Sequence, residues 1–183
     1  MGKTIIMISG KAGSGKDTVS DYLVKTKQDI VKLAFAGALK EYVGIKYGVS
    51  DRLLYTQEGK RQVINVYDEK MTVRELLIYE ANVKRLVDDL YWVNSILEKI
   101  KNVSGDAVIS DFRYPCEYNE MKRHYTRVLT INVLRDYKFT ECVEDPSEYQ
   151  LENFKFDFTV YNNSSKEDMY SQIDFIYNYF MSQ

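Results

Sequence analysis

A short run of apolar residues that breaks into a glycine-rich turn places the strongest constraint on the fold of this chain. Residues 4–9 read Thr-Ile-Ile-Met-Ile-Ser, which is typical of a strand buried on both faces. Residues 10–18 follow with the pattern G-x-x-x-x-G-K. From residue 17 to about residue 27, apolar side chains recur with helical spacing. Strand, glycine loop and helix in this order are the setting of a phosphate-binding loop.

The residue types in this loop match the chemistry of phosphate binding. Several backbone N–H groups must converge on the phosphate oxygens, and glycine leaves them accessible and permits positive φ. The N-terminus of the following helix adds a partial positive charge, and Lys16 can reach the β- and γ-phosphates of a nucleotide. We therefore expect a nucleotide at this loop, and an ordinary glycine turn is the alternative. The residues assigned to it are Gly10, Ala12, Gly13, Ser14, Gly15, Lys16, Asp17 and Thr18.

Asp17 departs from the usual pattern of such loops. The residue after the lysine is normally Ser or Thr, whose hydroxyl contacts Mg²⁺. An aspartate could bind the metal directly or through water, because carboxylate oxygens suit Mg²⁺. It could equally serve only as an acid in the first helical turn, where the helix dipole favours negative charge. The sequence leaves both interpretations open.

The composition favours one α/β domain with local binding sites. With 183 residues, of which 45% are hydrophobic, the chain is long enough for one well-packed domain. A net charge of −2 provides no general attraction for nucleic acid or for an anionic membrane, so we expect neither as a partner. No segment approaches the ~20 apolar residues of a membrane span, and nothing at the N-terminus resembles a signal peptide. We expect a soluble protein of the cytoplasm.

The cysteines and the histidine follow no metal or redox pattern. Cys116 and Cys142 lack C-x-x-C spacing, so we expect reduced thiols with packing roles. His124 follows Lys122 and Arg123 and is expected on the surface rather than in a catalytic role.

The remaining apolar runs predict a parallel sheet covered by helices. Further strands are expected at residues 30–35, 105–111, 128–134 and 156–160. Helices are expected at about 36–43, 71–81 and 83–100, after Pro115, and after the N-cap Ser165. Thr72 and Glu75 have the spacing of a capping box. Residues 48–68 read as an irregular polar connection, and residues 137–153 read as a polar flap.

Charged residues near the predicted ends of strands are candidates for a second binding site, because open α/β sheets bind ligands at the carboxyl edge. Asp111 ends the third strand in the manner of the Walker B aspartate that faces Mg²⁺. Arg113 follows two residues later, and a simple surface pair is the alternative for these two residues. Lys40, Arg74 and Arg85 are candidates for holding another phosphate, and solvated surface charges are the alternative for each.

Six segments, spread over nearly the whole chain, carry a family resemblance. They are residues 9–18, 35–40, 72–77, 109–117, 147–148 and 157–163. Together they resemble the bacteriophage deoxynucleoside monophosphate kinases, which are related to the adenylate kinases. After the phosphate loop, the most specific part of the resemblance is the Asp-x-Arg-x-Pro-x-Glu run at residues 111–117. The family also carries an aspartate after the loop lysine, as Asp17 does here.

This resemblance implies an α/β fold of the P-loop NTPase class. The sheet would have five parallel strands in the order 2-3-1-4-5, flanked by helices. A helical insertion at about 36–102 would bind the nucleoside monophosphate, and a short lid would lie at about 135–153. Residues 1–183 would form a single kinase domain.

The resemblance also implies a role for each site residue. The residues expected in catalysis are Lys16, Asp111, Arg113 and Arg135. Those expected to contact the deoxynucleotide are Lys11, Lys40, Arg74, Arg85 and Arg113. Those expected to bind Mg²⁺ are Asp17 and Asp111. Arg135, at the hinge of the lid, would close onto the ATP phosphates, and Asn162 and Asn163 would contact the adenine through backbone groups.

The sequence thus predicts transfer of the γ-phosphoryl group of ATP to a deoxynucleoside 5′-monophosphate, with Mg²⁺ and without a covalent intermediate. If the protein is encoded by a phage, this reaction would take place in the host cytoplasm. Another P-loop kinase, acting on phosphomevalonate or dephospho-coenzyme A, is one alternative. A nucleotide-binding module without turnover is another. The sequence leaves a homodimer open.

Overall fold

The computed structural model describes residues 2–136 and 149–183. The chain divides into two compact units. The first unit comprises Met1–Ala34 and Leu97–Gln183, and the second comprises Phe35–Ile96. The range predicted for the helical insertion, about 36–102, covers the second unit and the first few residues that return to the first.

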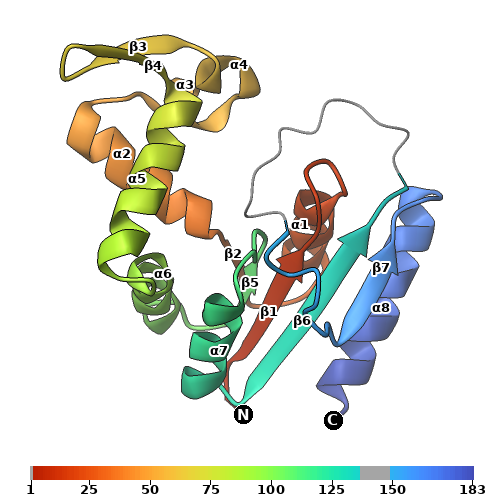
Figure 1. Cartoon of the computed structure of the whole chain (residues 1–183). Helices are drawn as coiled ribbons and strands as arrows, with labels where there is room; N and C mark the ends of the chain where they lie inside the picture. The colour runs from red at the N-terminus through yellow and green to blue at the C-terminus, as the bar shows by residue number, and fades with distance from the viewer. Residues whose placement is uncertain (1, 137–148) are drawn as a thin grey trace. The chain divides into compact units, whose positions relative to one another are not determined.

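The first unit is built on a five-stranded sheet (Figure 1). Its strands are β1 (Thr4–Ser9), β2 (Ile30–Leu33), β5 (Asp106–Ile109), β6 (Arg127–Leu134) and β7 (Phe158–Tyr161). They lie in the order β2-β5-β1-β6-β7, and all neighbours are parallel. Counted along the chain within this sheet, that order is 2-3-1-4-5. The predicted fold class and strand order are therefore confirmed.

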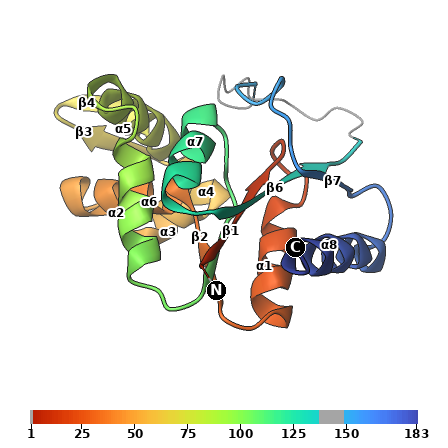
Figure 2. The same ribbon diagram turned by 90° about the horizontal axis from the view of Figure 1, so that it is seen from below.

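Helices cover both faces of this sheet (Figure 2). α1 (Lys16–Thr26) and α8 (Lys166–Met181) lie on one face, and α7 (Pro115–His124) lies on the other. The rings of Tyr22 and Tyr170 stack with centroids 4.0 Å apart and join α1 to α8. α8 begins at the predicted cap, where the Ser165 hydroxyl accepts a hydrogen bond from the Asp168 N–H at 3.1 Å.

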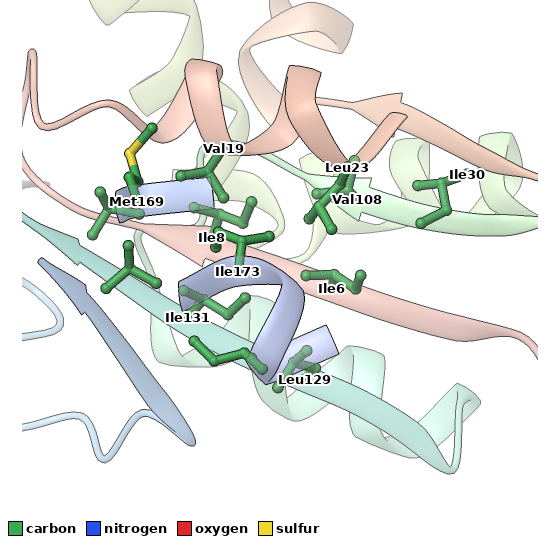
Figure 3. Packing of buried hydrophobic residues seen from close by; sticks show 13 residues of the cluster. Ile6, Ile8, Val19, Leu23, Ile30, Val108, Leu129, Ile131, Met169 and Ile173 are labelled. Carbon is green, nitrogen blue, oxygen red and sulfur yellow. The ribbon is translucent and has the colours of Figure 1, made fainter. Parts of the chain in front are cut away.

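β1 is buried along its whole length and forms the centre of the core. Ile6 and Ile8 point to the face covered by α1 and α8, where they belong to one apolar cluster with Ile173 (Figure 3). Ile5 and Met7 alternate to the opposite face and have no exposed surface. Burial of each such side chain contributes roughly 1.5–3 kcal/mol. A shift of one residue in the register of β1 would exchange its two buried faces, so the position of the loop that follows is well defined.

Three predicted strands have different ends in the structure. β2 stops at Leu33 because Phe35 already begins the next helix, and β5 stops at Ile109 because the chain turns there. β7 begins at Phe158, two residues later than predicted, because Asp157 anchors the strand instead of extending it. The Asp157 Oδ2 atom accepts hydrogen bonds from the N–H and the hydroxyl of Thr130, both at 2.8 Å.

The second unit contains helices and a hairpin. Its elements are α2 (Phe35–Tyr47), α3 (Asp51–Tyr55), α4 (Gln57–Lys60), β3 (Val63–Val66), β4 (Glu69–Thr72), α5 (Val73–Val87) and α6 (Tyr91–Lys101), of which α6 continues into the first unit. A separate apolar cluster holds it together, with Val43, Leu54, Val66, Val73 and Leu76 at its centre.

The prediction of an irregular connection at residues 48–68 is wrong, because this stretch contains α3, α4 and β3. β3 pairs antiparallel with β4 through a turn at Tyr67 and Asp68, which have φ values of 48° and 68°. Positive φ at both positions suits a tight hairpin, but the usual residues there are Asn-Gly or Asp-Gly. The Tyr67 ring packs edge-on against Tyr47, with centroids 5.8 Å apart. A contact between distant residues therefore supports a turn that has no local sequence signal.

The break between the two long helices lies later than predicted. α5 begins at the predicted capping box, in which the Thr72 N–H donates to Glu75 Oε2 at 2.7 Å. It continues to Val87, and the chain turns at Asp88, whose Oδ1 accepts from the Leu90 N–H at 2.8 Å. Apolar side chains recur on both sides of the turn, so periodicity alone did not locate it.

A buried carboxylate joins α2 to α5 in the second unit. Glu80 is 1% exposed, and its Oε1 accepts hydrogen bonds from Lys46 Nζ at 2.8 Å and from the Tyr47 hydroxyl. Its Oε2 has no hydrogen-bond partner among the described residues. Burial by itself would raise the pKa of Glu80, but the hydrogen bonds from Lys46 and Tyr47 and the charge of Lys46 hold that pKa below its ordinary value. The hydrogen bond to Glu80 raises the pKa of Lys46.

Replacing Lys46 by Met is expected to lower the free energy of unfolding by about 1.5–3 kcal/mol, the range for a hydrogen bond to a charged group. Urea unfolding followed by the fluorescence of Trp92 measures this, because Trp92 is the only tryptophan of the chain and is buried in the second unit. Since the folded-state pKa of Glu80 is lowered, the stabilisation is present above its ordinary value near 4.5 and is lost as the pH falls through the folded value. The difference between the two proteins should therefore shrink in acid.

Lys70→Met is the matched control, because Lys70 is an exposed residue of β4 in the same unit. An exposed substitution of this kind is expected to change the free energy of unfolding by less than ~0.5 kcal/mol. Equal unfolding curves for the two variants at neutral pH would show that the buried pair contributes nothing to stability.

Candidate functional site

The loop between β1 and α1 contains three glycines with positive φ, namely 146° at Gly10, 73° at Gly13 and 106° at Gly15. At Gly10, a Cβ atom would collide with the carbonyl oxygen of Val133 in β6. At Gly15, a Cβ atom would lie 2.6 Å from Nδ2 of Asn162. The loop therefore packs closely against two neighbouring segments, and only glycine fits at these two positions.

Lys16 begins α1 and folds back over the loop. Its Nζ donates to the carbonyl oxygen of Gly10 at 2.5 Å and to that of Lys11 at 2.9 Å. The Ser14 hydroxyl is buried and has no hydrogen-bond partner among the described residues. The first N–H groups of α1 also lack partners within the helix. The loop thus combines a cation with available N–H groups, which suits a phosphate group.

A cavity of about 390 Å³ lies beside this loop within the first unit. From the loop and α1 it is lined by Gly13, Gly15, Lys16, Asp17 and Thr18. From the ends of β6 and β7 and the start of α8 it is lined by Arg135, Asn162, Ser164, Lys166 and Met169. Three basic side chains and one acidic side chain face the cavity, so it favours an anionic ligand. Its glycine cradle and its cations fit the phosphate groups of ATP.

Sequence reasoning missed three residues of this cavity, namely Ser164, Lys166 and Met169. Ser164 lies between β7 and α8, and Lys166 and Met169 lie at the start of α8. A signal was available, because the carboxyl ends of parallel strands meet at one edge of the sheet. The loop after the last strand therefore had to come close to the loop after the first.

Asp17 is exposed and forms an ion pair with Lys32 of β2. Its Oδ1 lies 2.8 Å from Nζ of Lys32, which also lies 2.8 Å from Oδ1 of Asp21. No group of three or more metal-binding side chains gathers within the described part of the chain. Mg²⁺ bound to nucleotide phosphates needs only one or two carboxylates and water. Asp17 lines the cavity and fits that demand, and its role in metal binding remains a prediction.

The Asp-x-Arg-x-Pro-x-Glu run at residues 111–117 forms the turn after β5 and the start of α7. Glu117 is 2% exposed, and its Oε2 accepts hydrogen bonds from the N–H groups of Arg113 at 2.8 Å and Tyr114 at 3.0 Å. Glu117 therefore shapes the turn that carries Asp111 and Arg113. Both of these predicted site residues are partly exposed at the carboxyl end of β5.

Three other predicted residues of the first unit make contacts within the protein. The Lys11 ammonium lies 5.5 Å from the ring centroid of Tyr149. The Asn162 side chain donates to the carbonyl oxygen of Ser14 at 2.8 Å. Asn163 forms hydrogen bonds with Asp136. The predicted adenine contacts of the two asparagines through backbone groups remain a prediction.

The second unit brings two of its three predicted cations onto one segment. Lys40 Nζ lies 4.4 Å from the ring centroid of Tyr55, and Arg74 Nη2 donates to Gln57 Oε1 at 3.0 Å. Arg85 lies eleven residues after Arg74 on α5, which is roughly 16 Å along the helix axis. Lys40 and Arg74 therefore approach the same short segment, whereas Arg85 lies at the other end of α5.

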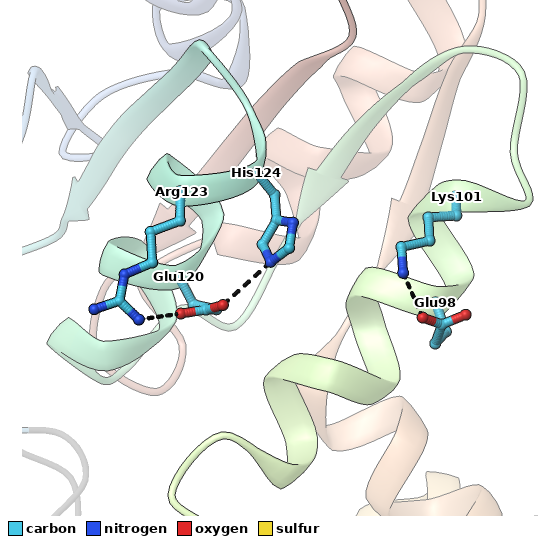
Figure 4. Close-up of polar contacts among 5 residues, drawn as sticks. All are labelled: Glu98, Lys101, Glu120, Arg123 and His124. Carbon is cyan, nitrogen blue, oxygen red and sulfur yellow. Dashed lines mark hydrogen bonds and ion pairs between the residues drawn. The ribbon is translucent and has the colours of Figure 1, made fainter.

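Cys116 and His124 both belong to α7. Cys116 is partly buried and forms no disulfide with another of the described residues. His124 lies on the surface at the end of α7, 3.1 Å from Glu120, which also pairs with Arg123 at 2.8 Å (Figure 4). Cys142, the matched segment 147–148 and residues 137–148 of the predicted flap lie outside the described residues.

Comparison with solved structures identifies the fold. TT1252 from Thermus thermophilus superposes with a TM-score of 0.58, at 16% identity over 98% of each chain. Dephospho-CoA kinase from Campylobacter jejuni superposes with a TM-score of 0.52, at 9% identity over 97% of each chain. No protein-family model and no curated protein matches the sequence. The chain has the α/β fold of P-loop kinases.

None of the helices within residues 2–136 and 149–183 has both the length and the hydropathy to cross a bilayer.

Replacing Gly10 by Ala is expected to weaken binding of a fluorescent ATP analogue at least ~10-fold, which corresponds to about 1.4 kcal/mol. The added methyl group would meet the carbonyl oxygen of Val133 and push the loop away from β6. Gly2→Ala is the matched control, because its Cβ would lie at an ordinary 3.7 Å from Thr126. A folded Gly10→Ala variant with unchanged affinity would contradict this account of the loop.

Proposed function

We propose that this protein is an ATP-dependent kinase that acts, with Mg²⁺, on deoxynucleoside 5′-monophosphates. The bond between the γ-phosphorus and the oxygen that bridges it to the β-phosphate breaks, and a bond from that phosphorus to a phosphate oxygen of the acceptor forms. The products are ADP and a deoxynucleoside diphosphate. The reaction needs no covalent bond to the protein.

One observation carries this proposal: the phosphate loop, the start of α1 and the side chains of Lys16, Arg135 and Lys166 meet at one cavity. Phosphoryl transfer depends mainly on positioning and on neutralisation of negative charge. The loop N–H groups would hold the triphosphate, Lys16 would contact the β- and γ-phosphates, and Arg135 would contact the phosphate tail from the end of β6. Asp17 and Asp111 are the candidate protein ligands of Mg²⁺, which would neutralise negative charge on the phosphate groups.

The acceptor assignment rests on the sequence resemblance and on the second cluster of cations. Lys40 and Arg74 both approach the segment of Tyr55 and Gln57. Two cations beside one short segment suit the phosphate of a monophosphate acceptor. Arg113, in the turn after β5, is a further proposed contact of the acceptor. Arg85 and Lys11 stay weaker candidates, because Arg85 lies at the far end of α5 and Lys11 contacts Tyr149.

A second candidate acceptor follows from the structural likeness to a dephospho-CoA kinase. That acceptor presents a ribose hydroxyl instead of a phosphate oxygen to the γ-phosphoryl group. A coupled assay that measures ADP formation with dTMP, dGMP, dCMP, dAMP, their ribose counterparts, phosphomevalonate and dephospho-coenzyme A separates these possibilities. Turnover of a deoxynucleotide supports the proposal. Turnover of dephospho-coenzyme A alone overturns it, and ATP binding without any turnover would indicate a regulatory module.

Lys16→Met is expected to lower kcat about 10²–10³-fold, or ~2.7–4 kcal/mol, as loss of one preorganised donor does. Steady-state kinetics with the best acceptor measures this. Lys25→Met is the matched control, because Lys25 is exposed in the last turn of the same helix. Near-normal turnover in a folded Lys16→Met variant would refute the assignment of Lys16.

Lys40→Ala and Arg74→Ala are expected to raise KM for the monophosphate about 10-fold or more, since each removes a charge-assisted hydrogen bond to its phosphate. KM for ATP should change little, because neither residue belongs to the unit that carries the phosphate loop. Lys70→Ala serves as the control within the second unit. If both variants kept the wild-type KM for the acceptor, the acceptor phosphate would bind elsewhere.

A further inference from the structure

The end of β6 carries Arg135, and a pair of asparagines after β7 contacts both sides of the cavity. β6 and β7 pair in parallel up to Leu134 and Tyr161. One residue later, the Asn162 N–H donates to the carbonyl oxygen of Leu134 at 2.7 Å, and the ladder ends. Arg135 therefore lies just beyond the last position that the sheet itself holds.

Beyond the end of the β6–β7 ladder, the side chain of Asn163 forms hydrogen bonds with Asp136. The Asp136 N–H donates to Asn163 Oδ1 at 2.7 Å, and Asn163 Nδ2 donates to Asp136 Oδ2 at 2.7 Å. These two bonds fix both the main chain and the side chain of Asp136. Arg135 is thus held between the Leu134 bond on one side and the Asp136 bonds on the other.

Asn162 performs the corresponding task on the other wall of the cavity. Its Nδ2 donates to the carbonyl oxygen of Ser14 at 2.8 Å. Gly15 leaves room for this contact, because a Cβ atom there would lie 2.6 Å from the same nitrogen. Two consecutive side chains therefore tie the phosphate loop and the Arg135 segment to the loop after β7.

We propose that Asn162 and Asn163 are positioning residues, and that Asn163 acts through Asp136 to direct Arg135 into the nucleotide cavity. This inference rests on the proposed function, in which Arg135 contacts the phosphates of ATP. The role concerns the side chains of the two asparagines and is separate from any contact of their backbone groups with the adenine. Asp136 and Asn163 are exposed, so their hydrogen bonds add little to stability. Their loss should reduce the rate of transfer rather than unfold the protein.

The polarity of the Asp136–Asn163 pair provides the test. Asn163→Asp places a second carboxylate against Asp136, and we expect kcat to fall about 10- to 100-fold, the size of effect that a 1 Å misplacement causes. Asp136→Asn keeps an acceptor for the Asn163 amide, so its effect should be several-fold smaller. In the double variant Asp136→Asn/Asn163→Asp, the new amide at position 136 can donate to the new carboxylate at position 163. We expect that exchange to restore most of the wild-type kcat.

A second cycle tests whether the effect passes through Arg135. In an Arg135→Ala background, Asn163→Asp should cause little further loss, because the residue that it positions is absent. Asn162→Ala, which frees the phosphate loop, should still lower activity in that background. The thermal midpoints of all variants are measured in parallel, and a loss of kcat without a matching loss of stability supports positioning.

The outcomes separate this inference from the proposed function. Suppose that the wild type turns over an acceptor. The inference is then overturned by any one of three results: Asn163→Asp keeps the wild-type kcat, the double variant is not rescued, or Asn163→Asp causes its full loss of kcat even in the Arg135→Ala background. If no acceptor is turned over, the proposed function fails. In that case the same variants are compared by their affinity for a fluorescent ATP analogue. A loss of affinity that the double variant does not rescue, or that does not depend on Arg135, again overturns the inference.

Discussion

The close packing of the phosphate loop against β6 is the constraint on which the candidate site depends. β1 is buried on both faces between β5 and β6, so its carboxyl end is fixed before the loop begins. Gly10 then passes so near the carbonyl oxygen of Val133 that no side chain fits. Because the sheet sets the start of the loop and Asn162 holds its far side, contacts within the protein itself organise the loop N–H groups. Such preorganisation is what electrostatic catalysis requires.

Positive charge is concentrated locally, at the cavity beside the phosphate loop. The net charge is only −2, and several lysines are neutralised by neighbouring acids, as Lys32 is by Asp17 and Lys46 by Glu80. Cations that line the cavity beside the phosphate loop come from three separate segments, the start of α1, the end of β6 and the start of α8. Attraction for a phosphate ligand is therefore local, and it needs no general excess of positive charge.

Part of the sequence resemblance to kinases consists of residues that support the fold. Glu117 of the Asp-x-Arg-x-Pro-x-Glu run accepts hydrogen bonds from the backbone of the turn after β5. Asp157 joins the start of β7 to Thr130 of β6. These hydrogen bonds explain why both carboxylates are present, without any contact to a substrate. Such motifs indicate the fold and the nucleotide more directly than the acceptor, whose recognition depends on pocket contacts.

The sequence by itself determined the sheet, the phosphate loop and the capped starts of α5 and α8, because these depend on local spacing and on buried apolar runs. The strand order followed from the family resemblance. The tertiary structure alone decided three other features. The hairpin of β3 and β4 turns at Tyr67, which packs against Tyr47, so its stability comes from outside the turn. Lys166 joins the cavity, and Asn163 holds Asp136, only because strands distant along the chain end at one edge of the sheet. A linear pattern carries the spacing within an element, but it does not carry the contacts between elements that folding creates.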